Sequence, residues 1–166
     1  MRKEWIAIII ILIVGLTSMF IIEQNSTTIG SAITTINDVS ITVPPQFKIS
    51  VSSVDQVILL DEATNETILV KYLNDGNNSL KEFQKEIKAI NDNENLEIHK
   101  NVTNKTVHTL YCENYEKEQN YTLTYFEKFD RTILIKMENF DNATRHDINL
   151  WYIIDNLQPD YKQSRS

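Results

Sequence analysis

Short apolar or alternating stretches, separated by turn residues, follow one another along the chain after residue 37 and predict β-strands. Pro44 and Pro45 end the first stretch, and a turn at 62–66 joins the third and fourth into a hairpin. Residues 128–131 form a tight turn between the last two. The pattern predicts an antiparallel sheet of about six to seven strands with one face covered. The stretches are residues 39–43, 47–51, 54–61, 67–73, 96–102, 106–112, 121–129 and 131–137.

Two segments instead carry apolar residues at spacings of three and four, the period of an amphipathic helix. The first begins at Ser79, whose hydroxyl and the Glu82 carboxylate have the spacing of a capping box. Residues 91–95, which are rich in Asn, end it. Its predicted buried stripe consists of Leu80, Phe83, Ile87 and Ile90.

The second predicted helix covers residues 143–157 and closes the domain. Asp141 or Thr144 can cap its first turn, and Pro159 prevents its continuation. Its predicted buried stripe consists of Ile148, Trp151, Ile154 and Leu157. Together the elements predict an α+β domain with two main helices.

Residues 5–22 form an uncharged apolar run. As a helix rising 1.5 Å per residue this run is about 27 Å long, close to the ~30 Å hydrocarbon core of a bilayer. A lone segment must be helical there, because its backbone groups have no water to bind. Arg2 and Lys3 precede the run, and this positive flank places the N-terminus in the cytoplasm. We therefore expect a transmembrane signal anchor with the C-terminal domain outside the cell.

A cleaved signal peptide and a pilin-like precursor are the alternatives to a retained anchor. A signal peptide has a shorter apolar run and a small-x-small site close behind it, whereas the first such site here, residues 30–32, lies well past the run. No Gly or Ala peptidase site precedes the run, and no cysteine for lipid attachment follows it closely. The expected organisation is a cytoplasmic N-terminus (1–4), the anchor (5–22), a polar linker (23–37), one extracytoplasmic domain (38–158) and a polar tail (159–166).

The formal net charge of the 166-residue chain is −7. Residues 2–4 contribute +1, so the outer part carries −8. Such an acidic domain is expected to repel nucleic acid and anionic lipid, and we interpret the charge mainly as a source of solubility. Cys112 is the single cysteine, which excludes an internal disulfide. It is either a buried small hydrophobic residue or the site of an intermolecular bridge.

Seven Asn-x-Ser/Thr acceptor sequences (sequons) occur in the chain, and chance pairing at this composition would give about two or three. The motif has meaning only outside the cytoplasm, so its frequency agrees with the orientation inferred from Arg2 and Lys3. Asn65, Asn77 and Asn142 are the strongest candidate N-glycosylation sites, because they fall in predicted turns. The other four sequons begin at Asn25, Asn101, Asn104 and Asn120.

The three histidines, His99, His108 and His146, have no metal-ligand spacing among them. His108 and Cys112 would share a strand face, but four residues at about 3.3 Å each separate them by about 13 Å. That distance is too long for a thiolate–imidazolium pair. We therefore expect surface or strand histidines without a catalytic role.

Residues 91–95 alternate oxygen-bearing side chains but lack the glycine that a calcium loop requires. Tyr121 and Tyr125 alternate on one strand, and we interpret them as half-buried sheet residues in preference to a binding platform. The sequence thus predicts no catalytic residue, no metal site and no cofactor. A pair of carboxylates that meet only in the folded domain remains the route to an enzyme.

The order of elements resembles the PsbP-like superfamily, whose fold is an α/β/α sandwich around an antiparallel sheet. The resemblance rests on ITVPPQFKIS, SLKEFQKEI, YTLTYFEKFDRTILIKM and INLWYIIDNL, and it covers about residues 37–157. The chain is also similar to small anchored exported proteins of methanogenic archaea, which share its bias toward Asn and Ile. The family has no common catalytic residues, so the resemblance implies an extracytoplasmic accessory or binding module.

We therefore expect a single-pass membrane protein that displays a binding or accessory domain without catalysis at the outer face of the cell membrane. Its partners are the membrane, through residues 5–22, and a membrane or cell-surface protein. Two alternatives stay open: an extracytoplasmic hydrolase whose site forms only in the fold, and a pilin- or adhesin-like subunit of a surface structure.

Overall fold

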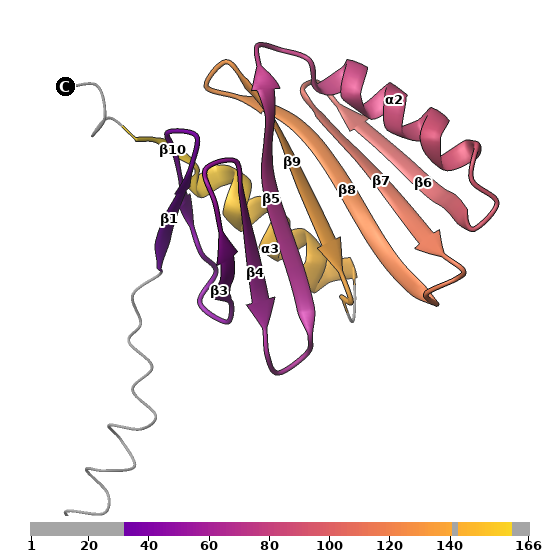
Figure 1. Cartoon of the computed structure of the whole chain (residues 1–166), viewed down its shortest axis with the longest axis horizontal. Coiled ribbons are helices and arrows are strands. Elements are labelled where there is room, and N and C mark those ends of the chain that lie inside the picture. Colours follow the sequence, from indigo (N-terminus) through magenta and orange to yellow (C-terminus); the bar gives the residue numbers. More distant parts are fainter. Residues whose placement is uncertain (1–31, 141–142, 161–166) are drawn as a thin grey trace, which may run out of the picture. The chain divides into compact units, whose positions relative to one another are not determined.

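Seven antiparallel strands form the main sheet in the order β3-β4-β5-β9-β8-β7-β6 (Figure 1). The structure is a computed structural model that describes residues 32–140 and 143–160. The main-sheet strands are β3 (Lys48–Ser52), β4 (Gln56–Asp61), β5 (Glu66–Asp75), β6 (Leu96–Asn104), β7 (Val107–Asn114), β8 (Gln119–Lys128) and β9 (Arg131–Glu138). Each corresponds to a stretch that the sequence predicts as a strand.

Both predicted short turns are present. The register of β4 on β5 places Asp61 opposite Glu66 at the two ends of the 62–65 turn. Between β8 and β9 the chain reverses over two residues, since Lys128 lies opposite Arg131. Phe129 and Asp130 both have positive φ angles, 55° and 60°. This is the geometry of a type I′ turn, which matches the twist of the flanking strands.

A second, three-stranded sheet is formed by β1 (Ile33–Ile36), β2 (Val39–Thr42) and β10 (Gln158–Pro159) in the order β1-β2-β10. The strand β1 lies within the segment expected to be a polar linker, so ordered structure begins before residue 38. The sequence ITTI reads as part of a polar spacer, yet Ile36 is fully buried. It joins Val39 and Ile41 of β2 in the main core.

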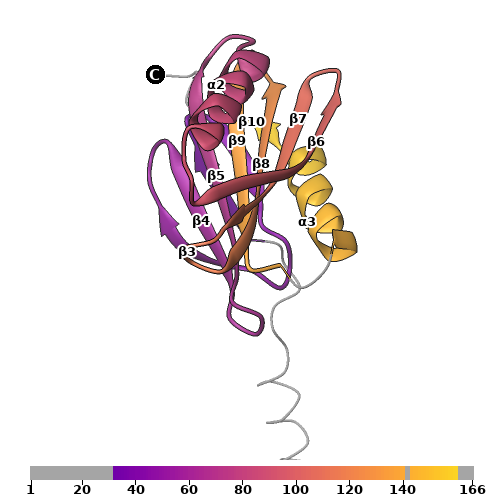
Figure 2. The same ribbon diagram turned by 90° about the vertical axis from the view of Figure 1, so that its right-hand side faces the viewer.

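Two helices, α2 (Ser79–Asn91) and α3 (Ala143–Asn156), lie on opposite faces of the main sheet (Figure 2). The larger core packs α3 and the small sheet against β4, β5 and β9. The smaller core packs α2 against β7 and β8. The predicted α+β class, two helices and antiparallel sheet are confirmed. Among the described residues no helix is long and apolar enough to span a membrane, and the predicted anchor at 5–22 lies outside them.

The capping box predicted at Ser79 is wrong. The N-cap residue of α2 is Asn78, which makes no side-chain cap hydrogen bond. The Ser79 hydroxyl and backbone N–H both donate to Glu127 Oε1 on β8, at 2.7 and 3.1 Å. A carboxylate from another element thus occupies the positive N-terminus of α2, where the helix dipole stabilises it. The predicted stripe of α2 is otherwise confirmed at Phe83 and Ile90, whereas Leu80 is exposed.

The buried face of α3 also differs from the prediction. Ile154 and Leu157 are buried as expected, but Ile148 is 63% exposed and Trp151 is 42% exposed. The residues that face the sheet instead are His146, Asn149, Leu150 and Ile153. The helix is rotated because two polar residues, His146 and Asn149, find hydrogen-bond partners inside and take the places that apolar residues would otherwise fill.

The rotation of α3 can be tested with two matched substitutions. Ile153→Ala removes a fully buried side chain and should lower the free energy of unfolding by about 2–5 kcal/mol. Ile148→Ala removes an exposed side chain and should change it by less than about 0.5 kcal/mol. Chemical denaturation of both variants measures the difference. A larger effect of Ile148→Ala than of Ile153→Ala would mean that α3 packs with its predicted face.

Candidate functional site

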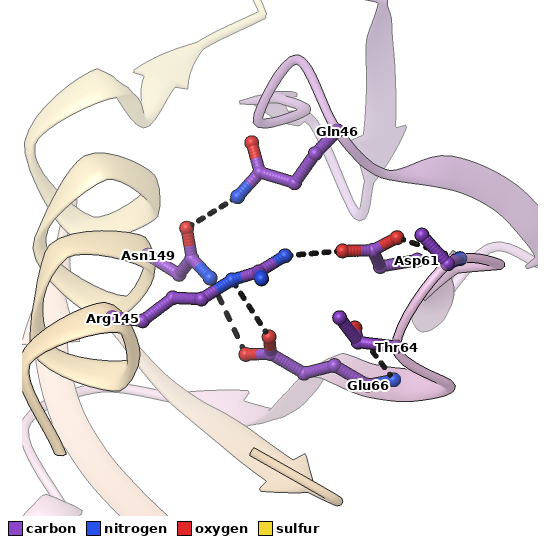
Figure 3. Close-up of polar contacts among 7 residues, drawn as sticks. Gln46, Asp61, Thr64, Glu66, Arg145 and Asn149 are labelled. Atoms are coloured by element: carbon purple, nitrogen blue, oxygen red, sulfur yellow. Dashed lines mark hydrogen bonds and ion pairs between the residues drawn. The ribbon is translucent and has the colours of Figure 1, made fainter. Parts of the chain in front are cut away.

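The largest cluster of buried charge lies where α3 crosses the β4–β5 hairpin (Figure 3). Asp61 and Glu66, at the two ends of the hairpin turn, are 3% and 1% exposed. The Arg145 guanidinium from α3 bonds Asp61 Oδ2 and lies 3.5 Å from Glu66 Oε2. The Asn149 amide donates to Glu66 Oε1 at 3.3 Å and accepts from Gln46 at 2.6 Å. These groups join α3 to the turn end of the β4–β5 hairpin.

The two carboxylates of this cluster are the pair that an acid–base mechanism would need. Burial raises the pKa of the Glu66 carboxyl, and its hydrogen bond from Asn149 and the nearby Arg145 charge oppose that rise. Glu66 Oε2 accepts no hydrogen bond, although Arg145 faces it. Both carboxyls are closed off from solvent and held by one guanidinium, so they anchor α3 and offer no open position to a substrate.

A second buried group has the connectivity of a hydroxyl–imidazole–carboxylate triad. Thr122 Oγ1 lies 2.7 Å from His146 Nε2, and His146 Nδ1 lies 2.9 Å from Asp147 Oδ1. The Tyr111 hydroxyl donates to the same Asp147 oxygen at 3.5 Å. A nucleophile must be reached by its substrate, but Thr122 and His146 are fully buried. The arrangement satisfies polar groups between α3 and the sheet.

Sequence reasoning missed both clusters. The sequence places Asp61 at a strand end and Glu66 in a turn, and it predicts surface or strand histidines without a catalytic role. The contacts join different elements of the chain: 84 positions separate Arg145 from Asp61, and 24 separate His146 from Thr122. The spacing of residues within one strand or helix does not reveal contacts between different elements. The one available signal was that polar residues interrupt the apolar stripe of the last helix.

The single thiol is unreactive at neutral pH. Cys112 is 2% exposed in the smaller core, and burial raises its pKa to about 11. Little thiolate exists at neutral pH, so neither nucleophilic attack nor metal binding is favoured. His108 is also buried, which lowers its pKa. His99 is partly exposed, with Nε2 2.8 Å from Glu113 Oε2. Within residues 32–140 and 143–160 no three acidic, His or Cys side chains gather as metal ligands.

The alternating tyrosines of β8 lie inside the smaller core. Tyr121 and Tyr125 are 8% and 4% exposed, so they form no open platform. Leu123 lies between them on the same face, as predicted. Burial raises the pKa of both phenols, and the nearby negative charge of Glu86 raises each of them further. A small cavity of about 280 Å³ beside these residues is bordered by charged side chains.

The α2 side of the sheet is covered only in part. The helix α2 contacts β6, β7 and β8, and on this side of the sheet no described helix lies over β3, β4 and most of β5 (Figure 1). Cross-strand pairs place Val51 beside Ile58, and Ile58 beside Leu69, on this surface. Val51 is 45% exposed, and the other two are half-buried. We call this surface the open face; it consists of Val51, Ile58, Leu60, Leu69 and Lys71.

On the other side of the sheet a groove runs between α3 and the β6–β7 hairpin. Its volume is about 260 Å³. Trp151 and Val102, 42% and 40% exposed, leave apolar surface in it. Lys100 Nζ lies 5.5 Å from the centre of the Tyr111 ring at one wall. We call it the α3–β6 groove; it is lined by Lys100, Val102, Asn104, Val107, Tyr111, Asp147 and Trp151, with Thr109 and Leu150 behind them.

The predicted glycosylation sites are accessible where they are described. Asn65 lies in the β4–β5 turn with a φ of 58°, and Asn77 follows β5; both side chains are exposed. Asn142 lies outside the described residues. Asn101 and Asn104, which the sequence ranks lower, lie in the edge strand β6 and are equally exposed.

The fold is similar to a solved structure. The solution structure of cyanobacterial PsbP (CyanoP) from Synechocystis sp. PCC 6803 superposes with a TM-score of 0.51 at 10% sequence identity. The match covers 81% of this chain and 97% of that chain. No protein-family model matches the chain, and no curated protein matches its sequence. The domain therefore has a PsbP-like fold, and at this identity the similarity concerns the fold alone.

The raised pKa of Glu66 predicts a pH dependence of stability. A carboxyl whose pKa is higher in the folded than in the unfolded state destabilises the fold once it ionises. Its contribution is therefore most favourable at acid pH and is lost as pH rises through the folded pKa. Relative to Glu66→Gln, the wild type should gain free energy of unfolding as pH falls from 7 toward 5.

Urea denaturation of wild type and variant across this pH range measures the effect. Glu62→Gln is the matched control, because Glu62 lies on the same hairpin but is exposed and paired only with Lys48. The free-energy difference between wild type and this control should change little with pH. A difference for Glu66→Gln that is constant with pH would contradict the burial argument.

Proposed function

We propose that the protein is a single-pass, membrane-anchored accessory module that binds a partner protein outside the cell and catalyses no reaction. The observation that carries the proposal is the open face, the apolar part of the sheet that no described element covers. The apolar run at 5–22, with Arg2 and Lys3 before it, supports the anchored topology. The buried state of Thr122 and His146 also favours binding over catalysis.

The open face has the chemistry of a protein-binding surface. Sheet faces in soluble domains are normally covered or polar, and a contiguous apolar patch on one of them marks an interaction site. Val51, Ile58, Leu60 and Leu69 form such a patch across three neighbouring strands. Burying it would contribute about 25 cal/mol for each Å² of apolar surface removed from water.

The charge around the open face indicates the kind of partner. Lys71 borders the patch on β5. Lys136 lies opposite Leu69 on β9, but Glu138 pairs with it at 2.5 Å. Lys71 is therefore the positive charge at this patch, in a domain whose outer part carries −8. A partner with an apolar patch and adjacent carboxylates would complement this surface, and the acidic remainder of the domain would repel it elsewhere.

Site-specific cross-linking of the intact protein in its native membranes tests this proposal. A photoreactive residue at Ile58 should form one discrete adduct, whereas the same residue at Lys88, exposed on the outer side of α2, should not. Lys71→Glu should reduce the Ile58 adduct by roughly tenfold or more, because like charges in an interface cost several kcal/mol. Lys81→Glu, an exposed charge reversal on α2, is its control.

Equal adducts from both positions, or an Ile58 adduct that survives Lys71→Glu, would contradict the proposal. Thermal unfolding of each variant confirms that the fold is intact. The topology is measured on the same cells: protease added outside should cut the domain without lysis. Cutting that requires lysis would show that the domain faces the cytoplasm.

A further inference from the structure

The α3–β6 groove combines apolar and polar side chains, and no further element of the described chain fills it. Trp151, Val102 and Val107 line it, and the Trp151 indole is 42% exposed beside the two aliphatic side chains. Its polar border is formed by Lys100 and Asp147. This combination of one aromatic face, two aliphatic side chains and a few charged groups suits a ligand with both apolar faces and hydroxyl groups.

One residue that lines the groove is itself a modification acceptor. Asn104 begins the sequon Asn104-Lys105-Thr106, and its side chain lines the groove beside Val102 and Val107. The sequon spans the two-residue turn between β6 and β7, in which Lys105 has a φ of 50°. Asn104 and Thr106 are both exposed, so an enzyme can reach the amide.

The exposure of sequon asparagines is selective. All five that the structure describes are exposed, at positions 65, 77, 101, 104 and 120. Of the ten other described asparagines only four are exposed, namely residues 91, 93, 95 and 139. Composition alone would produce sequons at buried and half-buried positions as well. The acceptors are therefore found where modification costs the fold nothing.

We propose that Asn104 carries an N-linked glycan whose first sugars lie in the α3–β6 groove against Trp151. The proposal rests on the extracytoplasmic placement in the proposed function. The bond forms between Asn104 Nδ2 and the anomeric carbon of a polyprenyl-phosphate-linked oligosaccharide. The polyprenyl phosphate leaves with the bonding electron pair, and the amide nitrogen loses one proton. The oxidation state of no atom in the acceptor changes.

The chemistry of a sugar fits this groove. A pyranose ring has an apolar C–H face, which packs on an indole, and a rim of hydroxyls, which can bond Lys100 and Asp147. Because the glycan is covalently attached at the border of the groove, its effective concentration is high, and a weak contact is enough to hold it there. The exposed apolar side chains are then covered by the chain's own modification.

A glycan on Asn104 would also affect the edge of the main sheet. The strand β6 is the last strand of the main sheet, pairs only with β7, and has nearly all of its residues exposed. Such an edge offers unpaired backbone groups to other chains. Asn104 lies opposite Val107 on the α3 side, while Asn101 lies opposite Leu110 of the α2-side core. Glycans on both would shield the edge from its two faces.

The test uses the full-length protein purified from its native membranes. Mass spectrometry of proteolytic peptides should find a glycan on Asn104 in the wild type and in Thr106→Ser, which keeps the sequon. Thr106→Val, which destroys the sequon at nearly constant volume, should carry none. Asn104→Gln is a second variant without an acceptor, in case the valine disturbs the turn.

Hydroxyl-radical footprinting of the same samples shows where the glycan lies. Oxidation of Trp151 should be severalfold higher in Thr106→Val and in Asn104→Gln than in the wild type and Thr106→Ser. Tyr115, which is 48% exposed on the β7–β8 turn and is not a groove residue, should be oxidised equally in all four.

An unmodified Asn104 in a domain that external protease can cut would overturn this inference and leave the proposed function standing. A glycan on Asn104 that does not change the oxidation of Trp151 would overturn the placement in the groove. A domain that protease cuts only after lysis would overturn the membrane topology and this inference together.

Discussion

A seven-stranded sheet has two faces to cover, and the described residues supply two helices for the purpose. The helix α3, with the small sheet, covers the part of one face that is formed by β4, β5 and β9. The helix α2 covers the part of the other face that is formed by β6, β7 and β8. Two uncovered regions remain at diagonally opposite ends of the sheet, the open face and the α3–β6 groove. Every exposed surface that we assign to a partner or a modification follows from this limit on coverage.

The position of α3 is fixed by polar contacts as much as by apolar ones. Arg145 lies over two buried carboxylates at one flank, and His146 bonds Thr122 on β8. Buried polar groups that have partners favour one orientation of the helix, because a rotation would remove those partners. The same orientation directs Trp151 toward the β6 edge. The buried contacts of α3 therefore determine which side chains line the α3–β6 groove.

The sequence predicts those parts of the fold that depend on interactions between residues close together in the chain. Period-two strands, the 62–65 turn and the tight turn at Phe129 and Asp130 were all visible, because each depends on neighbours within a few residues. The errors arose where a distant group competes with a local one. Glu127 displaces the local cap at Ser79, and partners on β5 and β8 draw Asn149 and His146 into the core. The open face and the α3–β6 groove could not be predicted from the sequence, because they depend on which helix covers which strands.

The small sheet brings the two ends of the described domain together, since β10 pairs with β2 and β2 pairs with β1. In the β1–β2 hairpin Ile33 lies opposite Thr42 at the open end. A force applied to the chain upstream of β1 therefore breaks the β1–β2 hydrogen bonds one after another, beginning at this open end. A force parallel to the strands would instead load all of these bonds together. The main sheet is reached only after β1 has peeled away. Under such a load the β1–β2 hairpin would open first and lengthen the chain while the main sheet stays folded.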